Sequence, residues 1–246
     1  MSLSSFARLT GAAALVGLTA FAANAQTSGE PIKVGAIVSI TGAGAGLGGP
    51  ERNGLLLAEK DINAKGGING RPLKIIVEDD ASNPDTALSK ANDLVFNQKV
   101  VALLGPSLTA STVAVGGVTH ANKIPQIAFT GIGPAVERER KCLAHVLPPQ
   151  KLNAQALLEY AKNIKATKIG VLHDAGYGNV VLAELKPMAD KYGVKLVAIE
   201  KFEIGATDTT TQAAKVKASQ PDAIFIIATS ATPFRNIKQI QATQPI

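Results

Sequence analysis

Apolar residues follow two alternating patterns along most of the chain. Short runs rich in β-branched residues, typical of buried strands, alternate with longer stretches whose apolar positions recur at helical spacing. This alternation predicts βαβ units and an α/β fold of parallel sheets covered by helices on both faces. The predicted strands are residues 32–40, 73–78, 100–104, 126–129, 168–173, 195–201 and 223–228, and the predicted helices are 51–64, 84–98, 109–122, 153–163, 178–192, 209–219 and 232–242.

The alternation is interrupted once, before Pro148-Pro149. An arm of irregular structure is predicted there, and the proline pair is the best candidate for a domain boundary. We therefore expect an N-terminal lobe over residues 26–147 and a C-terminal lobe over residues 148–246.

Residues 1–25 have the pattern of a secretory signal. A short start with one positive charge precedes the apolar run Ala12–Ala23, and Ala23-Asn24-Ala25 offers a cleavage site before Gln26. The run is too short to span a bilayer. We expect cleavage and a periplasmic location; the alternative is a buried N-terminal helix.

Composition narrows the classes of function. Hydrophobic residues make up 46% of the chain and aromatic residues 4%, so an aliphatic core is expected. The net charge of +6 is dispersed, without a basic stripe interleaved with aromatics, so nucleic acid is not an expected partner. The single cysteine, Cys142, excludes an internal disulfide and is predicted to be buried.

The Gly-rich stretch Gly44–Gly49 contains G-x-G-x-x-G between a predicted strand and helix, as in dinucleotide-binding proteins. The acidic pair Asp79-Asp80 follows about thirty residues later, beyond the usual spacing of about twenty. We interpret the stretch as a flexible βα loop near a ligand, and expect no cofactor.

Four hydroxyl residues lie where the strand at 100–104 turns into a helix: Ser107, Thr109, Ser111 and Thr112. Hydroxyls and free backbone N–H groups at such a helix start suit a carboxylate. The alternative is N-capping of the helix by these side chains. A nucleophile elbow is not expected, because Thr109 stands where that motif needs glycine.

Other polar residues indicate neither a metal site nor a catalytic one. His120, His145 and His173 lack the spacing of zinc ligands, and Glu78-Asp79-Asp80 is interpreted as a solvated strand edge. Tyr177 follows a predicted strand, where its ring could stack on a ligand or pack.

Several stretches together resemble the branched-chain amino acid type of ABC-transporter substrate-binding protein. They are residues 32–42, Asn53-Gly54, 61–73, 77–81, Gly105-Pro106-Ser107 and Tyr177-Gly178. The resemblance implies a type I periplasmic binding protein: two lobes joined by three crossings, which close on a small molecule and are recognised by an inner-membrane ABC permease. It implies a receptor and not an enzyme.

Site residues follow from the resemblance. Thr109 matches the residue that binds the ligand carboxylate, with Ser107 contributing its backbone, and Tyr177 matches a tyrosine that closes over the ligand from the second lobe. The full implied set is Ser107, Thr109, Thr130, Gly131, Tyr177, Thr229 and Ser230.

Three positions depart from amino-acid binders: Ile132 replaces a hydroxyl residue, Leu47 an aromatic wall and Thr229 a second tyrosine. The family's acidic partner for an ammonium group would lie beyond Ile246, as would further strands, so we interpret the second lobe as incomplete. The expected ligand is a small carboxylate: a branched-chain or related amino acid, or an aromatic acid. The alternatives are a sensor of the same fold coupled to a regulator, and an exported α/β hydrolase or oxidoreductase.

Overall fold

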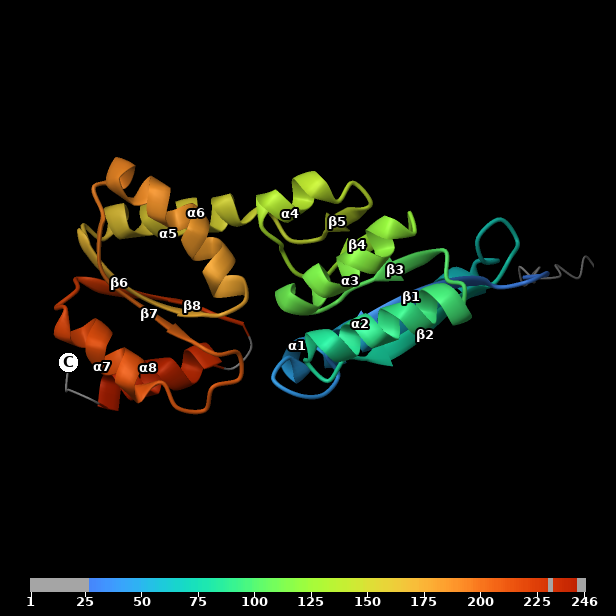
Figure 1. The fold of residues 1–246 in the computed structure, drawn as a ribbon, viewed down its shortest axis with the longest axis horizontal. Coiled ribbons are helices and arrows are strands. Elements are labelled where there is room, and N and C mark those ends of the chain that lie inside the picture. Colours follow the sequence, from blue (N-terminus) through green and yellow to red (C-terminus); the bar gives the residue numbers. More distant parts are fainter. Residues whose placement is uncertain (1–26, 230–231, 243–246) are drawn as a thin grey trace, which may run out of the picture.

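The computed structural model describes residues 27–229 and 232–242. They form two parallel β-sheets, each covered by helices on both faces (Figure 1). The predicted α/β class is confirmed. We call the five-stranded sheet with α1 to α4 the first lobe, and the three-stranded sheet with α5 to α8 the second lobe.

The sheet of the first lobe has the strand order β2-β1-β3-β4-β5, with every neighbouring pair parallel. Because β1 lies between β2 and β3 and all three run parallel, their carboxyl ends form one edge that carries the loops to the helices. The strands are β1 (Ile32–Val38), β2 (Leu73–Asp79), β3 (Ala102–Leu104), β4 (Gln126–Ala128) and β5 (Leu143–His145).

Helices of the first lobe cover opposite faces of this sheet. Alternate residues of β1 point to opposite sides: Ala36 and Val38 pack with Leu55 of α1, whereas Ile37 packs with α2 and α3. The helices are α1 (Ala45–Ala64), α2 (Pro84–Asn92), α3 (Thr109–Ala121) and α4 (Pro134–Glu139), and a π-helical turn, Asp93–Asn97, follows α2.

The second lobe repeats this plan around the strand order β7-β6-β8. Phe225 and Ile227 of β8 pack with α5 and α6, and Ile224 and Ile226 pack in the cluster that includes α7 and α8. The two pairs of helices lie on opposite faces of the sheet (Figure 1). The elements are β6 (Lys168–Asp174), β7 (Lys195–Phe202), β8 (Ala223–Ile227), α5 (Gln150–Asn163), α6 (Tyr177–Ala189), α7 (Thr210–Ala218) and α8 (Thr232–Ala242), with a 3-10 turn at Asp190–Tyr192.

The prediction of an irregular arm before Pro148 is wrong. The structure places α4 and β5 there, and β5 pairs in parallel with β4. Pro134 occupies the first turn of α4, where a missing N–H costs nothing. Strand β5, Leu143–His145, contains no β-branched residue, so its sequence carries no strand signal of its own. Cys142, predicted to be buried, is only partly so.

The predicted start of the first helix is also wrong. Helix α1 begins at Ala45, so most of the stretch interpreted as a flexible loop is helical. Gly48 allows the first turn of α1 to pack closely on Ser39, because a Cβ at position 48 would lie 2.2 Å from the Ser39 carbonyl oxygen. At the other end, Gly66 and Gly67 have positive φ and end the helix as predicted.

Loops at the carboxyl ends of the two sheets meet. The side chain of Ala43, after β1, lies against Gly205, after β7, and Val180 of α6 lies against Gly133, before α4. Among the described helices, none combines the length and the apolar character needed to cross a bilayer.

Candidate functional site

Thr109, Thr130 and Gly131 lie together at the carboxyl ends of β3 and β4. The Thr109 hydroxyl lies 3.2 Å from the Thr130 hydroxyl and donates to the Gly131 carbonyl oxygen at 3.2 Å. Thr109 is 8% exposed and Thr130 4%. Two adjacent parallel strands thus bring together three of the predicted site residues, although 21 positions separate the two threonines.

Thr109 is also the first residue of α3, so the N-terminus of this helix lies at the cluster. The N-cap residue is Leu108, and no side chain caps the helix, so the N-capping alternative for the hydroxyls is wrong. Thr112 instead donates to the Leu108 carbonyl oxygen at 3.0 Å. Because the first N–H groups of a helix have no partner within it, this terminus favours an anion.

Gly105 fixes the path of the loop from β3 to α3. Its φ is 85°, in the left-handed region that favours glycine, and a Cβ would lie 2.1 Å from the Ile37 carbonyl oxygen. The loop therefore crosses directly over β1. This close approach places Ser107 at the carboxyl end of β1.

Ser107 is tied to groups that sequence reasoning missed. Its hydroxyl oxygen accepts the Ser39 N–H at 2.9 Å and donates to the Glu51 carboxylate on α1. The Ser39 hydroxyl donates to Asp80 at 2.7 Å, and Asp80 is fully buried. The interpretation of Glu78-Asp79-Asp80 as a solvated edge is therefore wrong for Asp80.

Glu51 has a perturbed carboxyl group. Burial raises its pKa, the hydrogen bond from Ser107 lowers it, and the negative charge of Asp80 raises it; the net pKa lies above its ordinary value. Glu51 therefore takes up a proton more readily than an ordinary glutamate.

Gln150, the first residue of α5, lies against the site from the other side of the crossing. It is 2% exposed, and its amide nitrogen has no hydrogen-bond partner among the described residues. The amide fills the space beside Gly131, where a Cβ would lie 1.5 Å from Nε2. In the sequence, only the position of Gln150 directly after Pro148-Pro149 could have indicated that it lies near the site.

In the second lobe, hydrogen bonds to Asp174 connect the carboxyl ends of β6 and β8. This buried carboxylate accepts the N–H groups of Gly176 and Gly178 at 3.0 and 2.7 Å, and the N–H and hydroxyl of Thr229 at 2.7 and 2.6 Å. The predicted residues Tyr177 and Thr229 are thereby held at neighbouring strand ends, and the Thr229 hydroxyl already has a partner. Ser230 lies outside the described residues.

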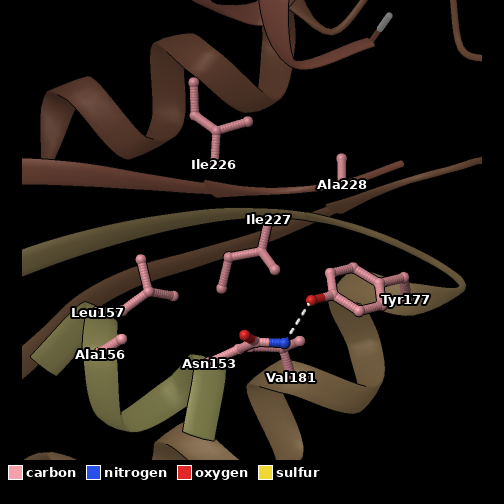
Figure 2. Close-up of a pocket in the computed structure, with 8 residues that line it drawn as sticks. All are labelled: Asn153, Ala156, Leu157, Tyr177, Val181, Ile226, Ile227 and Ala228. Atoms are coloured by element: carbon pink, nitrogen blue, oxygen red, sulfur yellow. Dashed lines mark hydrogen bonds between the residues drawn. The ribbon is translucent and has the colours of Figure 1, made fainter. Parts of the chain in front are cut away.

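Tyr177 faces an apolar cavity of about 380 Å³ between α5, α6 and β8. Its hydroxyl accepts a hydrogen bond from the Asn153 amide at 2.7 Å, and Figure 2 shows the ring turned toward that residue. Burial raises the Tyr177 pKa, the Asn153 bond lowers it and Asp174 raises it, with a net increase. The hydroxyl is therefore a neutral hydrogen-bonding group.

The site combines hydroxyl, backbone and amide donors. Within residues 27–229 and 232–242, no group of three or more His, Cys, Asp or Glu side chains is placed to hold a metal ion. Such donors orient a small polar molecule by hydrogen bonds, in the manner of a binding pocket.

Comparison with known proteins assigns the class. A family model described as "Periplasmic binding protein" matches residues 31–244. The chain therefore belongs to this family of solute-binding receptors, and within it to the type I proteins of the branched-chain amino acid group.

Individual relatives agree with this assignment. An "Amino acid binding protein" of Pseudomonas aeruginosa is 31% identical over 75% of this chain and 50% of the relative. The "Leu/Ile/Val-binding protein" of Escherichia coli K12 is 28% identical over 88% of this chain and 60% of the relative. An extracellular ligand-binding receptor of Rhodopseudomonas palustris HaA2 superimposes with a TM-score of 0.80 at 31% identity, covering 87% of this chain and 58% of the receptor. The chain thus spans 50 to 60% of these relatives.

Proposed function

We propose that this protein binds a small carboxylic acid between its two lobes and delivers it to an ABC permease in the inner membrane. The observation that carries the proposal is the cluster of Thr109, Thr130 and the Gly131 backbone at the start of α3, in a chain of the periplasmic binding protein family. A carboxylate that enters this cluster can accept the Thr109 hydroxyl, which then turns from the Gly131 carbonyl oxygen, and the free N–H groups of the helix.

The second lobe supplies the opposite wall in this proposal. Tyr177 and the Thr229 backbone lie at the ends of β6 and β8, and Gly131 and Gln150 lie at the crossing. The ligand class is a branched-chain or related amino acid, or an aromatic acid. The relatives from Pseudomonas aeruginosa and Escherichia coli are named as amino-acid-binding proteins, and the buried Ile132 supports an apolar ligand body.

The Thr109→Ala variant tests the carboxylate site. We expect it to weaken binding of leucine, isocaproate or benzoate by roughly 1.5–3 kcal/mol, the range for a hydrogen bond to a charged group. Isothermal titration calorimetry measures the affinity. Because Thr109 also bonds Gly131, a smaller loss of folding stability, about 0.5–1.5 kcal/mol, should accompany it.

Two controls separate binding from folding. Thr109→Ser keeps the hydroxyl and should keep most of the affinity, whereas Thr210→Ala removes an exposed hydroxyl of the second lobe and should leave affinity unchanged. Equal affinity of Thr109→Ala and the parent protein would contradict the carboxylate site.

We also propose that the protein acts in the periplasm after removal of residues 1–25, which lie outside the described residues. The family's name and the cleavage pattern Ala23-Asn24-Ala25 support this location. N-terminal sequencing of exported protein should begin at Gln26; exported protein that retains Met1 would contradict it.

A further inference from the structure

The Ser107 hydroxyl has one proton to donate, and it donates that proton to Glu51. Its oxygen accepts the Ser39 N–H at the same time, at 2.9 Å. Ser107 is two residues before Thr109, in the loop proposed to hold the ligand carboxylate. Ser107 can therefore donate to Glu51 or to a ligand, but not to both.

Two carboxylates from different elements contact Ser107 and Ser39. Glu51 comes from α1 and contacts Ser107, and Asp80 comes from the end of β2 and accepts the Ser39 hydroxyl. One oxygen of Asp80, Oδ2, is buried without a hydrogen-bond partner. No Lys, Arg or His side chain of the described residues forms an ion pair with either carboxylate.

The other surroundings of Glu51 are apolar. It lines a cavity of about 340 Å³ with Leu55 and Ala58 of its own helix and with Phe129 and Val146, which follow β4 and β5. Asp80 is thus the charged group that faces Glu51. Beside this partly buried carboxylate, the negative charge of a ligand near Ser107 further disfavours the ionised form of Glu51.

We propose that Glu51 couples ligand binding to the uptake of one proton. The inference rests on the proposed carboxylate site. As the acid binds, the Ser107 hydroxyl turns from Glu51 to the ligand carboxylate, and the Glu51 carboxylate takes a proton from solvent. The new O–H of Glu51 then donates to the second lone pair of the Ser107 oxygen, whose first lone pair still accepts the Ser39 N–H.

This rearrangement leaves every group of the serine bonded. Ser107 gives one hydrogen bond and accepts two, which is the full capacity of a hydroxyl. The direction of the Glu51 pKa agrees, because burial and the charge of Asp80 raise it above its ordinary value, against the lowering by the Ser107 hydrogen bond. The ligand's own charge moves that pKa further in the same direction.

Calorimetry on the purified full chain, with isocaproate as the probe and leucine beside it, tests the coupling. Isocaproate is leucine without its amino group, so only its carboxylate is recognised by charge. Titrations between about pH 5 and pH 8, in buffers of different ionisation enthalpy, give both the affinity and the number of protons taken up. We expect affinity to fall with rising pH, by up to about tenfold per pH unit, and uptake to approach one proton.

Glu51→Gln is the decisive variant, because an amide keeps the size and hydrogen-bonding capacity of the protonated acid but does not titrate. We expect the variant to bind isocaproate with affinity independent of pH and without proton uptake. Asp61→Asn, on the exposed side of the same helix, removes the same charge and should behave like the parent protein. Circular dichroism confirms that each variant is folded.

The outcomes are distinct. Binding of isocaproate without proton uptake by the parent protein overturns the coupling but leaves the proposed function intact. Loss of leucine binding in Glu51→Gln with isocaproate unaffected would assign Glu51 to an ammonium group and also overturns it. A parent protein that binds neither probe contradicts the proposed function, and the coupling with it.

Discussion

A side chain at position 131 would have to share its space with Gln150. The Gln150 amide nitrogen lies 1.5 Å from where a Cβ on Gly131 would be, and the glutamine is buried where the two lobes join. The Gly131 carbonyl oxygen also accepts the hydrogen bond from the Thr109 hydroxyl. The absence of a side chain at this position therefore sets the geometry of both the crossing and the hydroxyl cluster.

We expect Gly131→Ala to destabilise the protein by about 1–3 kcal/mol, the usual cost of overpacking, because the buried glutamine must move. Adding Gln150→Ala removes the obstructing amide and should recover most of that loss. Urea unfolding of the two single variants and the double variant gives the coupling free energy. Additive effects would show that the two residues do not compete for this space.

At the scale of single residues, the sequence indicates which polar residues lie at the strand ends better than it indicates their hydrogen-bond partners. Hydroxyls after β3 and β4 could be predicted to meet, because the ends of adjacent parallel strands lie side by side. The bond from Ser107 to Glu51 could not, since α1 lies 56 residues away in the chain and its side-chain directions depend on packing. Likewise, the bond between Asp174 and Thr229 spans 55 positions.

Among the elements, most segments with a clear apolar pattern were predicted, including the three-residue strands β3 and β4, whereas α4 and β5 were missed. Helix α8 has the predicted bounds, and α3 differs by one residue. The element missed in the sheet is β5, which has three residues and depends on pairing with β4 for its existence. Helix α1 gained its first turns because glycine allows close packing on Ser39, a contact that local propensity cannot reveal.

Strand β6 is joined to the start of β8 by one exposed carboxylate. Asp222 accepts the N–H groups of Thr167 and Lys168, both at 2.8 Å, and the Thr167 hydroxyl at 3.1 Å. The hydrogen bond from the Lys168 backbone, followed by that from Thr167, lowers the Asp222 pKa below its ordinary value of 3.8.

A carboxyl group whose pKa falls on folding adds stability above its unfolded pKa, and this stability is lost as pH falls through its folded pKa. We therefore expect Asp222→Asn to be less stable than the parent protein at neutral pH. The difference should shrink below about pH 4, the ordinary Asp value. Thermal melting from neutral to acidic pH measures it, with Asp190→Asn as an exposed control in the same lobe. A difference that is constant with pH would contradict the ionic contribution.

At the scale of the whole molecule, each sheet has a core of its own. The buried clusters of the first lobe draw on β1 to β3 and α1 to α3, and those of the second lobe draw on β6 to β8 and α5 to α8. The described chain passes between the sheets once, from β5 to α5. The sequence predicted this division from the proline pair, and we propose that the boundary lies at Pro148.

Because proteins open locally in contiguous cooperative units, two lobes with separate cores should unfold separately. Leu103 of the first core and Leu185 of the second are both fully buried, so either change to alanine should cost about 2–5 kcal/mol in its own lobe. Amide hydrogen exchange read by mass spectrometry should show lost protection within residues 27–147 for Leu103→Ala and within 148–242 for Leu185→Ala. Each variant is the control for the other. Protection lost equally in both lobes by either change would show a single cooperative unit, and the boundary at Pro148 would then be wrong.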